Sequence, residues 1–231
     1  MTDLRHHAGL WAGITALTLR SHPPPDTGMP SHTRTLVFSH ANSFPASTYR
    51  TLFEGWRAAG YDVRAIDKIG HDPRHPVTTD WPHLVDQLAT FIEEEVGQPA
   101  WLVGHSLGGA IVLQYTGTFP EHVARVCAIE GMGPPPEMVQ QMQEKQVEDR
   151  LRDYIRDTHA LSARKPREYA SLADAEARMR EANPHLSEDM ARHLTLHGVI
   201  RLENGHYAWK FDNYVRVWGP NRYDVEAVRR L

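Results

Sequence analysis

Residues 104–108 (GHSLG) place a serine between two glycines in the spacing G-x-S-x-G. The apolar run 100–103 precedes this segment, and a stretch of helical character, 106–117, overlaps it. A serine on such a strand-to-helix turn is lifted above the sheet, where its hydroxyl can attack an acyl carbon. We therefore predict that Ser106 is a nucleophile and that the backbone N–H of Leu107, at the start of the helix, stabilises a developing oxyanion. The alternative interpretation is a purely structural glycine-rich turn.

A second polar segment, residues 39–45 (SHANSFP), follows the apolar, β-branched run 35–39. Taken alone it is compatible with an ordinary loop, but together with 104–108 it resembles the α/β-hydrolase superfamily, specifically the serine hydrolases that carry a helical cap. In that superfamily the loop reads His-Gly-x, and the backbone N–H of x completes the oxyanion hole. The resemblance matches His40 to the histidine, Ala41 to the glycine and Asn42 to the oxyanion donor. Alanine in place of glycine is a mild departure that keeps the N–H.

The sequence lacks obvious partners for the serine. The resemblance covers residues 35–231, but the superfamily's acid and base follow later core strands that have no counterpart before Leu231. We therefore expect a core without its C-terminal strands. One branch of haloalkane dehalogenases places its acid at the strand end where Glu130 stands, so Glu130 is our tentative catalytic acid. A carboxylate that only shapes the pocket is the alternative.

Six histidines follow the serine, and none of them is assigned as the catalytic base: His122, His159, His185, His193, His197 and His206. His206 matches a variable cap position in the family. His193 and His197 are spaced i, i+4, as zinc ligands can be, but without a third ligand we expect packed or solvated side chains and no metal site. No nucleotide-binding glycine pattern follows a predicted strand, so we predict no cofactor.

These segments belong to a regular alternation of strands and helices. Strands are predicted at 35–39, 61–67, 100–104 and 123–130, and helices at 49–59, 80–97 and 106–117. Such alternation implies parallel strands joined by right-handed crossovers, with helices on both faces of the sheet. The predicted fold class is therefore α/β, with a parallel sheet of the α/β-hydrolase type.

The sequence texture changes after residue 133. We predict three parts: a loose N-terminal extension 1–34, a hydrolase core 35–133, and a helical cap or lid region 134–231. In the last part, helices are predicted at 137–160, 167–181 and 187–196, the third one capped by Ser187. One stripe of the first helix favours core packing over a substrate surface; it consists of Met138, Met142, Leu151, Tyr154 and Ile155.

Composition excludes several classes of protein. With 231 residues, 41% of them hydrophobic and 23% charged, the chain has an ordinary globular composition. Its formal net charge of -4 leaves no basic excess for phosphates, so we predict no nucleic-acid partner. No apolar run reaches the roughly 18 residues that a membrane span requires. The single cysteine, Cys127, excludes an intramolecular disulfide, is expected in the core, and favours a cytoplasmic location.

These observations predict a hydrolase that cleaves a carboxylic ester, or a related acyl bond, of a small molecule through a Ser106 acyl-enzyme. The alternative is a truncated or non-catalytic hydrolase-like protein, because the usual acid and base are missing. A sheet that ends at the strand 123–130 would leave an open edge, and open edges favour self-association.

Overall fold

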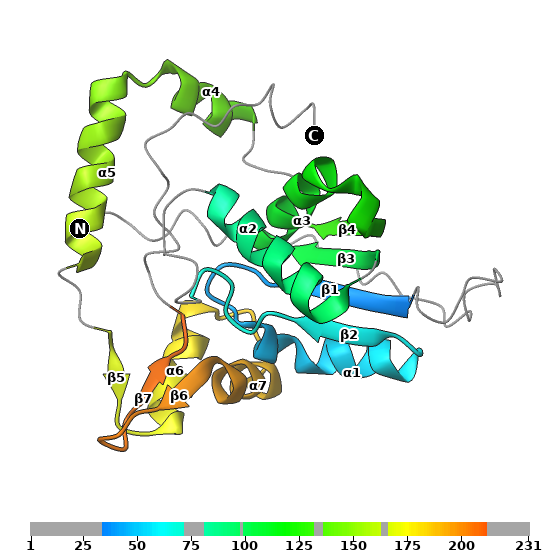
Figure 1. The fold of residues 1–231 in the computed structure, drawn as a ribbon. Helices are drawn as coiled ribbons and strands as arrows, with labels where there is room; N and C mark the ends of the chain where they lie inside the picture. Colours follow the sequence, from blue (N-terminus) through cyan, green and yellow to red (C-terminus); the bar gives the residue numbers. More distant parts are fainter. Residues whose placement is uncertain (1–33, 72–80, 98, 132–135, 163–165, 212–231) are drawn as a thin grey trace. The chain divides into compact units, whose positions relative to one another are not determined.

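The computed structural model describes residues 34–71, 81–97, 99–131, 136–162 and 166–211, all within the unit Ser31–Leu231 (Figure 1). Apart from Arg34, the predicted extension 1–34 therefore lies outside the described residues. The end of the predicted cap region, 212–231, lies outside them as well. The division into extension, core and cap stays a prediction.

Four strands form the sheet that positions the candidate site: β1 (Thr35–Ser39), β2 (Asp62–Ala65), β3 (Ala100–His105) and β4 (Val123–Ile129). They pair in the order β2-β1-β3-β4, and each pairing is parallel, which confirms the predicted α/β class (Figure 1). The register places Ser39 of β1 beside Gly104 of β3. The loops that leave these two strands therefore start side by side at the carboxyl end of the sheet, where open α/β sheets bind their ligands.

Helices cover both faces of the sheet, because successive side chains of a strand point to opposite faces. On one face, Val37 and Leu102 are fully buried in a cluster with residues of α2 (Trp81–Phe91) and α3 (Leu107–Thr118). On the other face, Phe38 packs with Phe53 of α1 (Arg50–Ala58). Burying a side chain of this size contributes roughly 1.5–3 kcal/mol to the stability of the fold, so packing on both faces stabilises the strands that carry the site. Three short helical segments complete this part: η3 (Ala46–Tyr49), η4 (Ile92–Val96) and η5 (Pro120–His122).

Strand β4 is one of the two outer strands of the described sheet, and most of its side chains are exposed. Val126 and Ile129 each keep 39% of their surface accessible. Cys127 is exposed as well, so the prediction that it is a core residue is wrong. The physical reason is its place in the sheet: described strands flank β1 and β3 on both sides and β4 on one side only.

The region after residue 135 contains helices and a small antiparallel sheet. α4 (Pro136–Glu144) and α5 (Val147–Ser162) replace the single helix predicted over 137–160. The strands β5 (Glu168–Tyr169), β7 (Tyr207–Trp209) and β6 (Val199–Arg201) pair in that order, and α6 (Leu172–Ala182) and α7 (Glu188–Gly198) lie between β5 and β6 in the chain. Ser187 is the N-cap of α7, as predicted, because its Oγ accepts the Met190 N–H at 3.2 Å. The sequence does not predict these strands, since two or three residues are too few to show an alternating pattern.

Three of the five residues in the apolar stripe of α4 and α5 are exposed, and Tyr154 is half-buried. Met138, Leu151 and Ile155 keep 41%, 44% and 52% of their surface accessible. The prediction of core packing is wrong for these residues, because no residue of the two helices belongs to a buried cluster of the described chain. Across the same described ranges, no helix is long and apolar enough to cross a lipid bilayer.

Candidate active site

Ser106 occupies a strained turn between β3 and α3. Its φ and ψ angles are 52° and −115°, in a region that residues with a side chain rarely adopt. Such backbone strain costs about 1–3 kcal/mol and persists only where neighbours enforce it. Here the Ser106 N–H donates to Ile129 O at 2.8 Å, and Ser106 O accepts the Ala110 N–H at 3.2 Å. The end of β4 and the first turn of α3 therefore hold the strand-to-helix turn that the sequence predicts.

The glycines around the serine permit close backbone packing. A Cβ atom at Gly104 would collide with the backbone of Gly108. A Cβ atom at Gly108 would collide with the carbonyl group of Ser39 and would lie 2.7 Å from His40 O. The structure therefore presses the start of α3 directly against the loop that leaves β1, which brings the two predicted oxyanion-donor segments together.

His40 anchors the loop after β1. Its side chain is buried, with Nδ1 2.8 Å from Ala41 O, and its Nε2 accepts the Ile69 N–H at 2.8 Å. Because the amide of Ile69 can only donate, Nε2 is the unprotonated nitrogen and Nδ1 carries the hydrogen. Burial lowers the pKa of His40 to about 4, so the ring is neutral at physiological pH. The resemblance matches this residue by position, and the structure supplies its partner on the segment after β2.

Asn42 lies in the tight turn that follows His40. The Phe44 N–H donates to Ala41 O at 3.1 Å, and Ser43 adopts a positive φ of 70°. Ser43 Oγ donates to the Asn42 side-chain oxygen at 3.4 Å. Asn42 itself is half-buried. Its assignment as an oxyanion donor stays a prediction, placed on a loop that adjoins the serine turn.

Glu130 reaches the same end of the sheet. It follows β4 directly, is exposed, and has a positive φ of 52°. The next residue, Gly131, packs so closely that a Cβ atom there would lie 2.7 Å from Ser106 O. Burial lowers the pKa of His105, and the nearby Glu130 carboxylate acts in the opposite direction. The structure thus brings Glu130 close to the serine turn, while its role as an acid stays a prediction.

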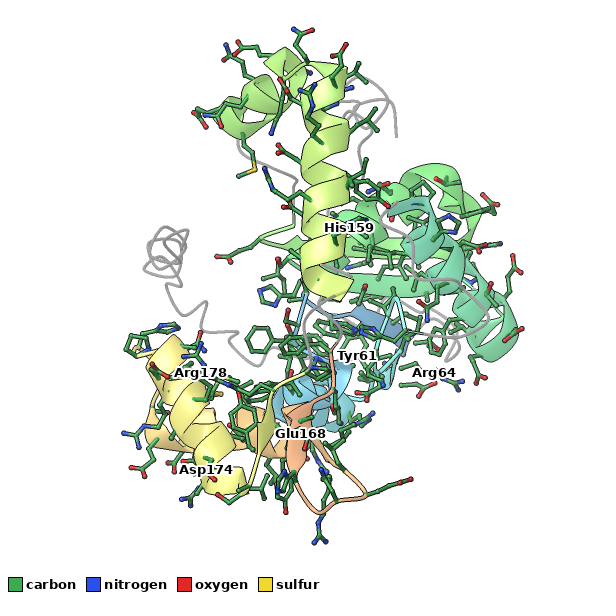
Figure 2. All side chains as sticks on the ribbon, turned by 90° about the vertical axis from the view of Figure 1, so that its left-hand side faces the viewer. Tyr61, Arg64, His159, Glu168, Asp174 and Arg178 are labelled. Carbon is green, nitrogen blue, oxygen red and sulfur yellow. The ribbon has the colours of Figure 1, made fainter. Side chains whose placement is uncertain are left out.

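Several of the later histidines contact other parts of the chain. His193 Nε2 donates to Thr48 O at 3.0 Å, and the ring centroids of His193 and His197 are 4.6 Å apart. His206 Nδ1 is 3.1 Å from a carboxylate oxygen of Glu168, which Figure 2 labels on β5. The described residues hold no group of three or more histidine, cysteine, aspartate or glutamate side chains suited to a metal ion.

His122 and His159 lie near the ends of two helices, α3 and α5. His122 Nδ1 lies 2.8 Å from the Tyr115 hydroxyl at the end of α3. His159 lies in the last turn of α5, as Figure 2 shows. The geometry of the described residues therefore leaves the base unassigned, as in the sequence analysis.

A parallel sheet with a strained serine turn at the carboxyl end of an inner strand is the architecture of an α/β hydrolase. A sequence profile described as "Alpha/beta hydrolase family" matches residues 36–230. The chain belongs to the alpha/beta hydrolase family.

Individual relatives agree with this family. A serine hydrolase-like protein from Danio rerio is 26% identical over 180 residues, which are 76% of this chain and 54% of that protein. The chain therefore spans about half the length of this curated relative. An esterase from M. tuberculosis has a TM-score of 0.61 and 24% identity, over 86% of this chain and 63% of the esterase. A thioesterase domain from the curacin biosynthetic pathway has a TM-score of 0.59 and 21% identity, over 83% of this chain and 68% of that domain. These two structures share the fold.

Proposed function

We propose that the chain is a serine hydrolase that cleaves a carboxylic ester or a related acyl bond of a small molecule. In this mechanism Ser106 Oγ attacks the acyl carbon and transfers its proton to a base, and the carbonyl oxygen becomes an oxyanion. The alcohol then leaves with that proton, and water releases the acyl-enzyme. The observation that carries the proposal is the strained conformation of Ser106, at the start of α3 and against the loop after β1.

This arrangement is best suited to the stabilisation of the oxyanion. The N–H of Leu107 lies at the N-terminus of α3, where amide groups and the helix dipole favour negative charge. The Asn42 N–H is the proposed second donor. In other hydrolases the loss of one such donor costs about 2.7–4 kcal/mol of transition-state stabilisation. We propose these two backbone groups as the oxyanion hole.

The acid and base limit the expected rate. Glu130 is the proposed acid, because it follows the end of β4 and its charge acts to raise the pKa of His105. A carboxylate can orient a histidine, but a serine without a base of suitable pKa is a poor nucleophile at neutral pH. His193, His206 and His122 contact other groups. This observation favours a second candidate function, a hydrolase-like protein that binds a small acyl compound without rapid turnover.

Labelling with a fluorophosphonate probe tests the proposal, because the probe reports an activated serine without requiring the natural substrate. We expect the full chain to be labelled and Ser106→Ala to lose the label. Ser187→Ala is the matched control: it removes a hydroxyl from the cap of α7 and should keep the label. Equal labelling of Ser106→Ala and the parent chain would refute the nucleophile.

Turnover of p-nitrophenyl acetate separates the two candidate functions. Rates of about 1 s⁻¹ or faster, within the usual range of enzymes, would show that a histidine of this chain acts as the base. Labelling without turnover would favour the binding protein.

A further inference from the structure

The hydroxyl of Tyr49 joins two segments that lie far apart in the sequence. Tyr49 ends the helical turn η3, and its ring packs on Phe38 of β1 with 4.6 Å between ring centroids. The Ala41 N–H donates to Tyr49 Oη at 3.3 Å. The same oxygen lies 2.7 Å from Nδ1 of His105. One phenol therefore contacts both the loop after β1 and the end of β3.

These two contacts adjoin the proposed oxyanion donors. Ala41 directly precedes Asn42, and only the serine separates His105 from Leu107. We propose, resting on the serine hydrolase function above, that Tyr49 is a positioning residue whose hydroxyl fixes the two oxyanion-donor segments relative to each other. It acts through these segments and does not touch the reacting atoms.

The hydrogen-bonding capacity of a phenol fits this role. Tyr49 Oη can accept the Ala41 N–H and at the same time donate its own hydrogen to His105 Nδ1. Burial raises the pKa of the Tyr49 phenol above its usual value, so the hydrogen is retained at neutral pH. Burial also lowers the pKa of His105, which favours the neutral ring, and Nδ1 is the acceptor in the tautomer that carries its hydrogen on Nε2. Both polar contacts are therefore satisfied in one proton arrangement.

The backbone of Ala41 is held on both of its polar groups. Its N–H bonds to Tyr49, and its carbonyl oxygen lies 2.8 Å from Nδ1 of the buried His40. Ala41 is only 4% exposed, so water cannot readily replace a lost partner. Removal of the Tyr49 hydroxyl should therefore free the His40–Ala41 amide, while the His40 side chain still holds the carbonyl group of the next peptide, which leads into Asn42.

The test compares Tyr49→Phe with Tyr115→Phe in the full chain. Both substitutions keep the aromatic ring and remove a hydroxyl that contacts a histidine Nδ1, because Tyr115 Oη lies 2.8 Å from His122. Tyr115 lies in the last turn of α3, at the opposite end from the serine turn. The assay is the rate of Ser106 modification by a fluorophosphonate, separated into the inactivation rate kinact and the binding constant KI.

We expect Tyr49→Phe to lower kinact about 10- to 100-fold, somewhat less than the complete loss of an oxyanion donor. KI and the thermal midpoint should match those of Tyr115→Phe, whose kinact should equal that of the parent chain. A purely structural role for Tyr49 would instead lower the thermal midpoint and leave kinact of the folded fraction unchanged.

Amide hydrogen exchange, measured by NMR, gives a second readout that needs no reactive serine. We expect the Ala41 amide to exchange at least about tenfold faster in Tyr49→Phe than in Tyr115→Phe or the parent chain, because it loses its acceptor. If the parent chain is not labelled at all, the serine hydrolase proposal fails and this exchange rate alone decides whether Tyr49 fixes the segment. Unchanged kinact in a labelled protein, or unchanged Ala41 exchange in an unlabelled one, would overturn the role of Tyr49.

Discussion

The close contact at Gly108 predicts what a single methyl group would do there. A Cβ atom at this position would lie 2.7 Å from His40 O and even nearer to Ser39 O, whereas an ordinary contact is 3.4 Å or longer. To restore an ordinary contact, position 108 and the His40 carbonyl oxygen must move apart by about 0.7 Å. Both neighbours are backbone atoms, of the last residue of β1 and of the residue after it, so no side chain can rotate to make room. Gly108→Ala must separate the start of α3 from the loop that carries Asn42.

Two effects of known size follow from this displacement. Overpacking of a tight contact costs about 1–3 kcal/mol of stability. A misplacement approaching 1 Å at a reacting centre costs on the order of 100-fold in rate. Gly55→Ala is the control, because Gly55 lies inside the exposed face of α1 with nothing within 4 Å of the added atom. There the same substitution should be neutral or stabilise the protein by up to about 1 kcal/mol.

Urea denaturation and fluorophosphonate labelling measure the two effects separately. We expect Gly108→Ala to unfold at lower urea than the parent chain and, where it is still folded, to react about 100-fold more slowly. Gly55→Ala should show neither change. If Gly108→Ala unfolds and reacts like the parent chain, the close packing of α3 against the end of β1 does not exist in solution.

Three further predictions concern charge and the sheet edge. His40 has a pKa of about 4 in the folded chain and 6.5 in the unfolded chain, so the unfolded state binds the proton first as the pH falls. The free energy of unfolding should therefore decrease between about pH 6.5 and pH 4, by on the order of 3 kcal/mol. Urea denaturation at several pH values should show a smaller pH dependence for His40→Asn. Glu130→Gln should slow labelling at least tenfold if the carboxylate is the acid, whereas a pocket-shaping carboxylate would leave the rate within about twofold. The exposed strand β4 should drive self-association, and Val126→Lys should shift the protein towards monomer in light scattering, because edge charges oppose strand pairing; a parent chain that is already a monodisperse monomer would show that the edge is covered.

The sequence alone determined the sheet and the identity of the serine turn. Strands and helices that alternate over short distances carry their own periodicity, so the parallel α/β arrangement is readable before any contact is known. The pattern G-x-S-x-G is a local signal in the sequence, and Gly104 meets the backbone of Gly108 within the turn, whereas the close contact of Gly108 is with Ser39 of another strand. The Ser106 conformation, with φ of 52°, is what that local pattern implies.

Other features depended on which segments meet in space. Cys127 and the apolar residues Leu151 and Ile155 of α5 are exposed. Whether an apolar residue is buried depends on the segments that pack on it, and these cannot be read from the residue's own stretch of sequence. The three short strands after residue 166 arise from pairing between distant segments and have no periodicity of their own.

The candidate site shows the same division. Sequence supplied Ser106 and the neighbouring glycine pattern, and a resemblance supplied Asn42 and His40. Only the tertiary structure brings Ile69 to the His40 ring and places the Tyr49 hydroxyl between Ala41 and His105. These contacts link residues from separate strands and loops, because β1 pairs in parallel with β2 on one side and with β3 on the other.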